Sequence, residues 1–171
     1  MGPQIGMEYA RRMGISHYDD NSAYLSTALG SQELTAIDMA QAYSVFANNG
    51  VKVDLHTVRR IENRHGQVLY EQRSIPDQVL SPQTSFIIND ILRDVVTSTT
   101  ARGLQATRPL AAKTGTTDDS RDIYLAAYAP NLVVSFWMGY DELEMGNITY
   151  GWNYTTGIVR PVLNEVFKDL P

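Results

Sequence analysis

The sequence predicts an α+β fold, in which an antiparallel sheet packs against helices. Three short apolar segments, 110–116, 123–129 and 132–139, follow one another with short polar connections, which is the pattern of an antiparallel meander. Two longer segments, 35–50 and 81–98, repeat their apolar residues at helical spacing. The chain of 171 residues suits one domain or a large part of one.

Capping residues mark where the first helices begin and end. Pro3 favours a first helical turn, and Gly14 closes a short helix. Thr35 with Asp38 forms a capping box, and the Asn48-Asn49-Gly50 run tolerates a left-handed end. Polar residues between these limits form one narrow stripe, so we expect a mostly buried helix with core side chains at Met39, Tyr43 and Phe46.

The next helix begins at Ser81, an N-cap, with Pro82 at its first helical position. Its expected apolar stripe comprises Ile87, Ile88, Ile91, Leu92, Val95 and Val96. We expect the opposite face to be solvated rather than to form a catalytic carboxylate pair; it comprises Asn89, Asp90, Arg93 and Asp94. A last helix, from about Val159 to Asp169, is expected to cover one sheet face with Val162, Leu163, Val166, Phe167 and Leu170.

Segments 57–62 and 67–72 predict a small hairpin, because the loop between them ends at Gly66. Three histidines, His17, His56 and His65, have no second ligand type at metal-binding spacing around them. We therefore expect surface or locally bonded histidines and no metal site.

Composition excludes several classes of function. A net charge of -5 without a basic cluster gives no reason to bind nucleic acid. The chain has no cysteine, which excludes disulfides and thiolate metal sites. The longest apolar run, Ile123 to Met138, is interrupted at Pro130 and is too short for a bilayer helix. No signal peptide or membrane anchor is visible near Met1.

Lys113, Thr114, Gly115 and Thr116 form the candidate binding site, at the exposed end of the first strand. Pro109 near the start of the strand favours an edge position, since proline cannot donate to a sheet ladder. A period of two places Lys113 and Gly115 on one face and the two threonines on the other. An edge with one cation, hydroxyls and free amides suits an anionic, extended peptide. The competing interpretation is an ordinary surface lysine on a solvated strand end.

The segments around this site resemble a known family. KTGTT, DIYLAAYAP and VVSFWMGYD, preceded by TARG and by LTAIDMAQAYSVFANNG, resemble the C-terminal half of a penicillin-binding protein transpeptidase domain. The resemblance is narrower still to the bifunctional class that also carries a glycosyltransferase, and it runs from about Gly2 to Lys168. It implies the fold shared by penicillin-binding proteins and serine β-lactamases, in part. Thr99 stands where the family usually has glycine.

The resemblance implies acyl transfer through a serine. In this superfamily an S-x-x-K motif supplies the nucleophile, an S-x-N motif adds a third polar group and K-T-G lines the opposite wall. Only K-T-G occurs here, because no Ser-X-Asn triplet is present and the residues three places before Lys52, Lys113 and Lys168 are Asn49, Leu110 and Glu165. Residues 1–171 are thus expected to be the C-terminal part of a single domain whose nucleophile lies outside this chain.

Carried over by the resemblance, Lys113 holds charge near the nucleophile and the substrate carboxylate. Thr114 and Thr116 donate hydroxyl hydrogen bonds to that carboxylate, and the backbone amide of Thr116 is an oxyanion-hole donor. The implied partners are the D-alanyl-D-alanine stem peptide of peptidoglycan, β-lactams and the absent part of the domain. No metal or organic cofactor is implied. The expected location is outside the cytoplasm, anchored to the bacterial plasma membrane by a segment beyond this chain.

Two other functions stay open. A β-lactamase or β-lactam sensor of the same fold shares K-T-G, although the extended match in LTAIDMAQAYSVFANNG argues against it. A non-enzymic binding module would keep the fold without the chemistry.

Overall fold

The computed structural model describes residues 2–16, 23–140 and 151–170, without the side chains of 119 and 151–153. His17 therefore lies outside the described residues. The helices are α1 (Pro3–Arg12), α2 (Ala36–Ala47), α3 (Pro82–Ser98) and α4 (Gly151–Asp169), with 3-10 turns η2 (Leu25–Leu29), η3 (Arg102–Leu104) and η4 (Asp118–Ser120). The strands are β1 (Val51–Lys52), β2 (Arg60–Glu62), β3 (Val68–Glu71), β4 (Asp77–Gln78), β5 (Ala111–Thr116), β6 (Asp122–Ala129) and β7 (Leu132–Gly139).

The main sheet has the order β5-β6-β7 and is antiparallel throughout. The predicted meander and the α+β class are therefore confirmed. Within the described part of the chain β5 pairs only with β6, so β5 is an edge strand, as Pro109 predicts. The register aligns Lys113 with Ala126, and Gly115 with Tyr124.

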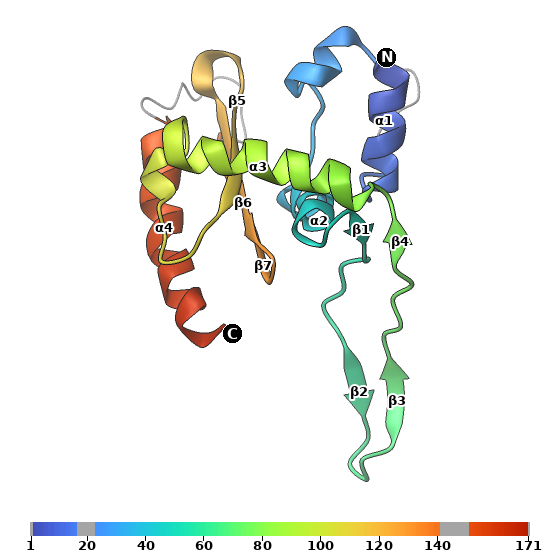
Figure 1. Ribbon diagram of the computed structural model, residues 1–171. Helices are drawn as coiled ribbons and strands as arrows, with labels where there is room; N and C mark the ends of the chain where they lie inside the picture. Colours follow the sequence, from blue (N-terminus) through green and yellow to red (C-terminus); the bar gives the residue numbers. More distant parts are fainter. Residues whose placement is uncertain (1, 17–22, 141–150, 171) are drawn as a thin grey trace.

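Helices cover both faces of this sheet (Figure 1). On one face α4 and the end of α3 form the main hydrophobic core, which contains Ala112, Leu125, Ala127, Val96, Val159, Leu163 and Phe167. On the other face α2 packs against the sheet, where Tyr128 lies 6.0 Å from Tyr43 and 6.4 Å from Phe46 between ring centroids. Since opposed residues of an antiparallel pair share a face, β6 is buried from both sides.

Helix α2 begins and ends where its capping residues predict. The Asp38 amide donates to the Thr35 hydroxyl at 3.2 Å, and the Asp38 carboxylate accepts from the Thr35 amide at 3.0 Å. Gly50, with φ +87°, ends the turn after the helix. The polar stripe is partly buried, because the Gln41 amide donates to the Val53 carbonyl at 3.0 Å and accepts from the Leu55 amide at 2.8 Å. Gln41 thus attaches the chain after β1 to α2.

Helix α3 begins as predicted, with the Thr84 amide donating to the Ser81 hydroxyl at 3.1 Å. The expected division of its faces is correct in part, since Ile88, Leu92, Val95 and Val96 are buried or half-buried and Asp90, Arg93 and Asp94 are exposed, but three residues differ. Asn89, assigned to the solvated face, donates to the Phe46 carbonyl at 3.2 Å and accepts from the Tyr128 hydroxyl at 2.7 Å. Ile87 and Ile91, assigned to the buried stripe, are 59% and 60% exposed. Asn89 lies where the helix crosses the sheet, so this polar side chain finds partners in both α2 and β6.

Helix α4 begins at Gly151, well before the expected start near Val159. Val159, Leu163 and Phe167, spaced by four residues, are buried against the sheet, as expected for the last two. Val162 and Val166, also expected on the sheet face, are 53% and 37% exposed. The buried stripe is thus narrower than the apolar pattern predicts.

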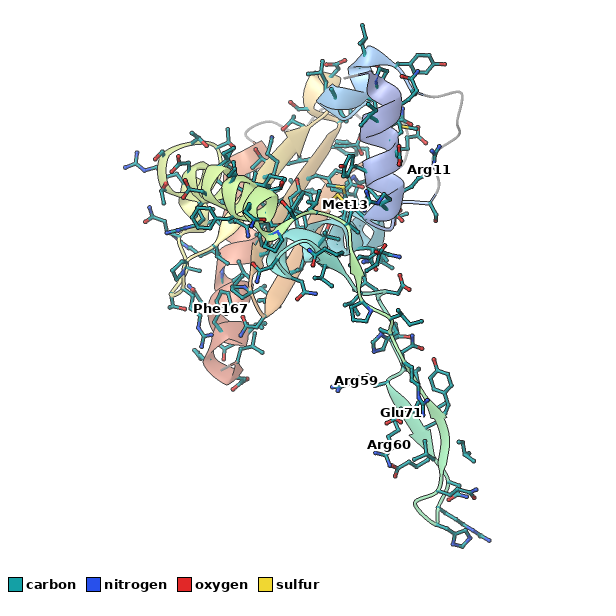
Figure 2. All side chains as sticks on the ribbon, turned by 45° about the vertical axis from the view of Figure 1, so that its right-hand side comes forward. Arg11, Met13, Arg59, Arg60, Glu71 and Phe167 are labelled. Atoms are coloured by element: carbon teal, nitrogen blue, oxygen red, sulfur yellow. The ribbon has the colours of Figure 1, made fainter. Side chains whose placement is uncertain are left out.

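Strands β2 and β3 form the predicted hairpin, an arm that extends away from the rest of the molecule (Figure 1). Every residue of both strands is exposed, and Figure 2 shows Arg59, Arg60 and Glu71 along this arm. His56 and His65 lie near the two ends of the arm and bond locally, to the Asp54 carbonyl and the Arg64 guanidinium. No group of three metal-ligating side chains occurs among the described residues.

Gly50→Ala should destabilise the fold far more than Gly30→Ala does. Both glycines have φ near +88°, at +87° and +88°, so alanine at either costs about 1–2 kcal/mol for its backbone conformation. At Gly50 a Cβ would also lie 2.2 Å from the Leu80 carbonyl oxygen, whereas nothing lies within 4 Å at Gly30. We expect a loss of about 3 kcal/mol or more at Gly50. Urea titration of both variants checks this, and equal losses would contradict it.

Stability should fall at alkaline pH because of the tyrosines beneath the sheet. Burial raises the pKa of Tyr43 from 10.0 to about 12, and burial followed by the nearby Tyr43 raises the pKa of Tyr128. A tyrosine whose pKa is raised in the folded state contributes its full stabilisation at pH values below the unfolded-state pKa. The free energy of unfolding then falls as pH rises through 10 to 12, by up to about 1.4 kcal/mol per pH unit for each tyrosine. Unfolding of Tyr43→Phe should be less steep in pH; the exposed Tyr70→Phe is the control. Identical pH slopes in Tyr43→Phe and the parent would contradict the assignment.

Candidate functional site

The K-T-G residues lie on the edge strand β5, in its C-terminal half. Lys113, Gly115 and Thr116 are exposed and Thr114 is half-buried. The Lys113 ammonium donates to the Thr114 carbonyl at 2.7 Å. Lys52 and Lys168 each lie beside a carboxylate, at 2.7 and 2.5 Å. In the part of the chain that the structure describes, Lys113 has only a carbonyl partner, so its charge is available to an anionic ligand.

The hydrogen-bonding pattern between β5 and β6 shows which backbone amides of β5 point toward β6 and which point away from it. The Thr117 amide donates to the Asp122 carbonyl at 3.0 Å, across to the partner strand. In an antiparallel pair, successive residues direct their amides alternately inward and outward. The amides of Thr116 and Thr114 therefore point away from β6, and the carbonyl of Thr114 is the one that Lys113 reaches. Among the described residues, the outward edge thus carries amides that no other strand pairs with, beside a cation.

The two threonine side chains lie on the sheet face opposite to Lys113, as the period of two predicts. Thr114 has a partner that sequence reasoning missed, because its hydroxyl oxygen lies 2.8 Å from the hydroxyl oxygen of Thr100. Thr100 belongs to the loop between α3 and η3. The sequence gives little reason to predict this contact, because Thr100 is one threonine within a polar run, although it begins the TARG segment.

Gly115 lies opposite Tyr124, whose hydroxyl donates to the Leu34 carbonyl at 2.6 Å. Partial burial, followed by the charges of Asp122 and Asp38, raises the pKa of Tyr124. Asp122 accepts from the Trp137 indole at 3.0 Å. These bonds fix the end of the β5–β6 hairpin that carries the site.

The site has one wall in the described residues. Two surface concavities lie elsewhere, one beside α2 at the base of the hairpin arm and one over Pro82, Phe86 and Ile87 of α3. A strand edge with a cation and free amides can bind an extended anionic peptide by adding it as a further strand. Enclosing that ligand requires a second wall.

Comparison with known proteins identifies the family. A model of the penicillin-binding protein transpeptidase domain matches residues 6–164. The chain belongs to this family. It is 35% identical over 159 residues to penicillin-binding protein 1A of Neisseria meningitidis serogroup A, which covers 88% of this chain and 20% of that protein. The chain thus spans about a fifth of the length of this curated relative.

Solved structures of penicillin-binding proteins share the fold. PonA1 from Mycobacterium tuberculosis matches with a TM-score of 0.82 and 24% identity, over 99% of this chain and 51% of that one. Penicillin-binding protein 1A from Haemophilus influenzae matches with a TM-score of 0.81 and 21% identity, over 99% and 32%. The fold expected from the K-T-G resemblance is therefore confirmed. No described helix is both long and apolar enough to span a bilayer.

Gly115→Ala should leave the fold nearly unchanged. A Cβ at Gly115 would meet only the Tyr124 Cβ, at 3.5 Å, and the backbone there is not left-handed. Its stability should change by less than about 1 kcal/mol. Gly103→Ala is the matched comparison, since its Cβ would lie 2.7 Å from the Thr156 hydroxyl and cost about 1–3 kcal/mol. Thermal unfolding compares them. A large loss at Gly115 would show that the glycine serves folding rather than an open strand edge.

Proposed function

We propose that this chain provides the substrate-binding wall of a peptidoglycan D,D-transpeptidase. The observation that carries the proposal is the exposed Lys113 on an edge strand, within a chain that belongs to the penicillin-binding transpeptidase family. The substrate is a D-alanyl-D-alanine stem peptide, and β-lactams occupy the same wall. The parent protein also carries a glycosyltransferase and a membrane anchor, and acts outside the cytoplasm.

Lys113 attracts the terminal carboxylate of the stem peptide as a point charge. The outward amide of Thr116 donates to the carbonyl oxygen of the scissile bond as negative charge develops there. Thr116 and Thr114 donate hydroxyl hydrogen bonds to the carboxylate. Gly115 leaves the strand surface clear for the peptide backbone.

The reaction is acyl transfer in two steps. A serine hydroxyl oxygen attacks the carbonyl of the penultimate D-alanine, the amide bond breaks, and the departing D-alanine amine takes up the proton. An amine of a second stem peptide then attacks the acyl-serine ester, and the serine oxygen leaves and recovers a proton. Neither step requires a metal or an organic cofactor.

The serine belongs to polypeptide outside the printed sequence. No S-x-x-K or S-x-N motif occurs in residues 1–171, so the chain alone binds substrate without forming an acyl-enzyme. The second wall of the groove comes from the same absent part of the domain. Slow deacylation of the complete domain supports a transpeptidase, whereas rapid turnover of penicillin supports the β-lactamase alternative.

Labelling with a fluorescent penicillin tests the proposal. The complete domain should be labelled covalently, and residues 1–171 alone should not. Lys113→Ala should slow labelling of the complete domain by on the order of 100-fold, since it removes charge stabilisation at the reacting group. Lys52→Ala is the control, because Lys52 binds Asp54 away from the strand. A stable adduct on the isolated chain, or an unchanged rate in Lys113→Ala, contradicts the proposal.

A further inference from the structure

The loop after α3 places the Thr100 hydroxyl within hydrogen-bond distance of the K-T-G strand. The hydroxyl oxygens of Thr100 and Thr114 lie 2.8 Å apart, although the residues are 14 positions apart in the chain. This bond joins the end of α3 to the middle of β5. In Figure 1 α3 crosses β5, and the two elements pack together.

We propose that Thr100 is a positioning residue, which directs the Thr114 hydroxyl proton toward a substrate carboxylate. The proposal rests on the proposed function of the strand. Thr100 itself does not touch the substrate. It acts through the one hydrogen bond that it makes with Thr114.

The donor inventory gives the direction of this bond. A threonine hydroxyl donates one hydrogen bond and accepts others, whereas an ionised carboxylate only accepts. When Thr114 donates to a carboxylate, its oxygen is free only to accept, so Thr100 must be the donor in the pair. The resulting chain runs from Thr100 to Thr114 to the carboxylate, and each bond polarises the next. Without Thr100, the Thr114 hydroxyl loses this partner and rotates freely.

The local backbone holds Thr100 in place. The adjacent Ala101 is fully buried, at 0% exposure, and its amide donates to the Val95 carbonyl at 3.1 Å. The Thr99 hydroxyl donates to the same carbonyl at 3.3 Å. The Leu104 amide then bonds to the Ala101 carbonyl at 2.8 Å. Thr100 is therefore attached on both sides to the end of α3 and the start of η3.

This arrangement recognises a carboxylate from two sides of one strand. Lys113 supplies charge from the face near α2, and Thr114 supplies a directed donor from the face near α4. A point charge has little directional preference, whereas a hydroxyl donor fixed by a second hydroxyl does. Thr100 thereby improves geometric selection for a planar carboxylate.

Acylation of the complete transpeptidase by benzylpenicillin and by its methyl ester tests the proposal. Thr100→Val keeps the shape and removes the hydroxyl. We expect it to slow acylation by the free acid by about tenfold, the effect of one hydrogen bond, and to slow acylation by the ester by less than about twofold. Thr100→Ser should retain the parent rate. Thr97→Val, one helical turn earlier, is the matched control and should change neither rate.

The double variant Thr100→Val with Thr114→Val should be no slower than Thr114→Val alone, because Thr100 acts only through Thr114. Equal losses for acid and ester would assign Thr100 a structural role and overturn the proposal, as would an unchanged rate in Thr100→Val. Failure of the parent to acylate, or an active Lys113→Ala, would instead overturn the proposed function.

Discussion

The pairing of β5 with β6 is the constraint on which the site depends. It uses the inward amides and carbonyls of β5 and leaves the outward ones of Thr114 and Thr116 directed away from the sheet. The same register places Lys113 opposite Ala126 and Gly115 opposite Tyr124 on the neighbouring strand. Slipping the pairing by one residue would move Lys113 to the α4 face, and the cation would then point into the hydrophobic core.

Strand β6 carries small residues on both of its faces. Ala126, Ala127 and Ala129 are buried, and their short side chains allow helices to approach the sheet from both faces. Tyr128 lies between them on the α2 face and bonds to Asn89, which in turn bonds to α2 through the Phe46 carbonyl. The Asn89 side chain of α3 therefore joins helix α2 to strand β6, the strand that pairs with the K-T-G strand. Since Asn89 is surrounded by partners from two elements, its removal would leave the Tyr128 hydroxyl without a partner.

Local signals predicted those parts of the fold that local chemistry decides. Thr35 and Ser81 cap helices through bonds that span three residues, and the meander follows from short connections between apolar runs. The position of Asn89 on α3 could not be predicted from spacing, since its partners Tyr128 and Phe46 are distant in sequence. The Thr100 contact depends on how α3 crosses β5. The alternation of Lys113 with Thr114 was predictable, because the strand period alone decides it.

A strand edge can bind an extended anionic peptide, but it cannot break an amide bond. In the proposed function, Lys113 supplies charge and the Thr116 amide donates a hydrogen bond, and neither group is the nucleophile. Stabilising a developing oxyanion also requires that water be excluded, which one wall does not achieve. In the proposed function, binding belongs to this chain and the covalent chemistry belongs to the rest of the domain. In the proposed function, residues 1–171 supply the recognition half, and a serine-bearing wall must close over the same edge before the reaction can proceed.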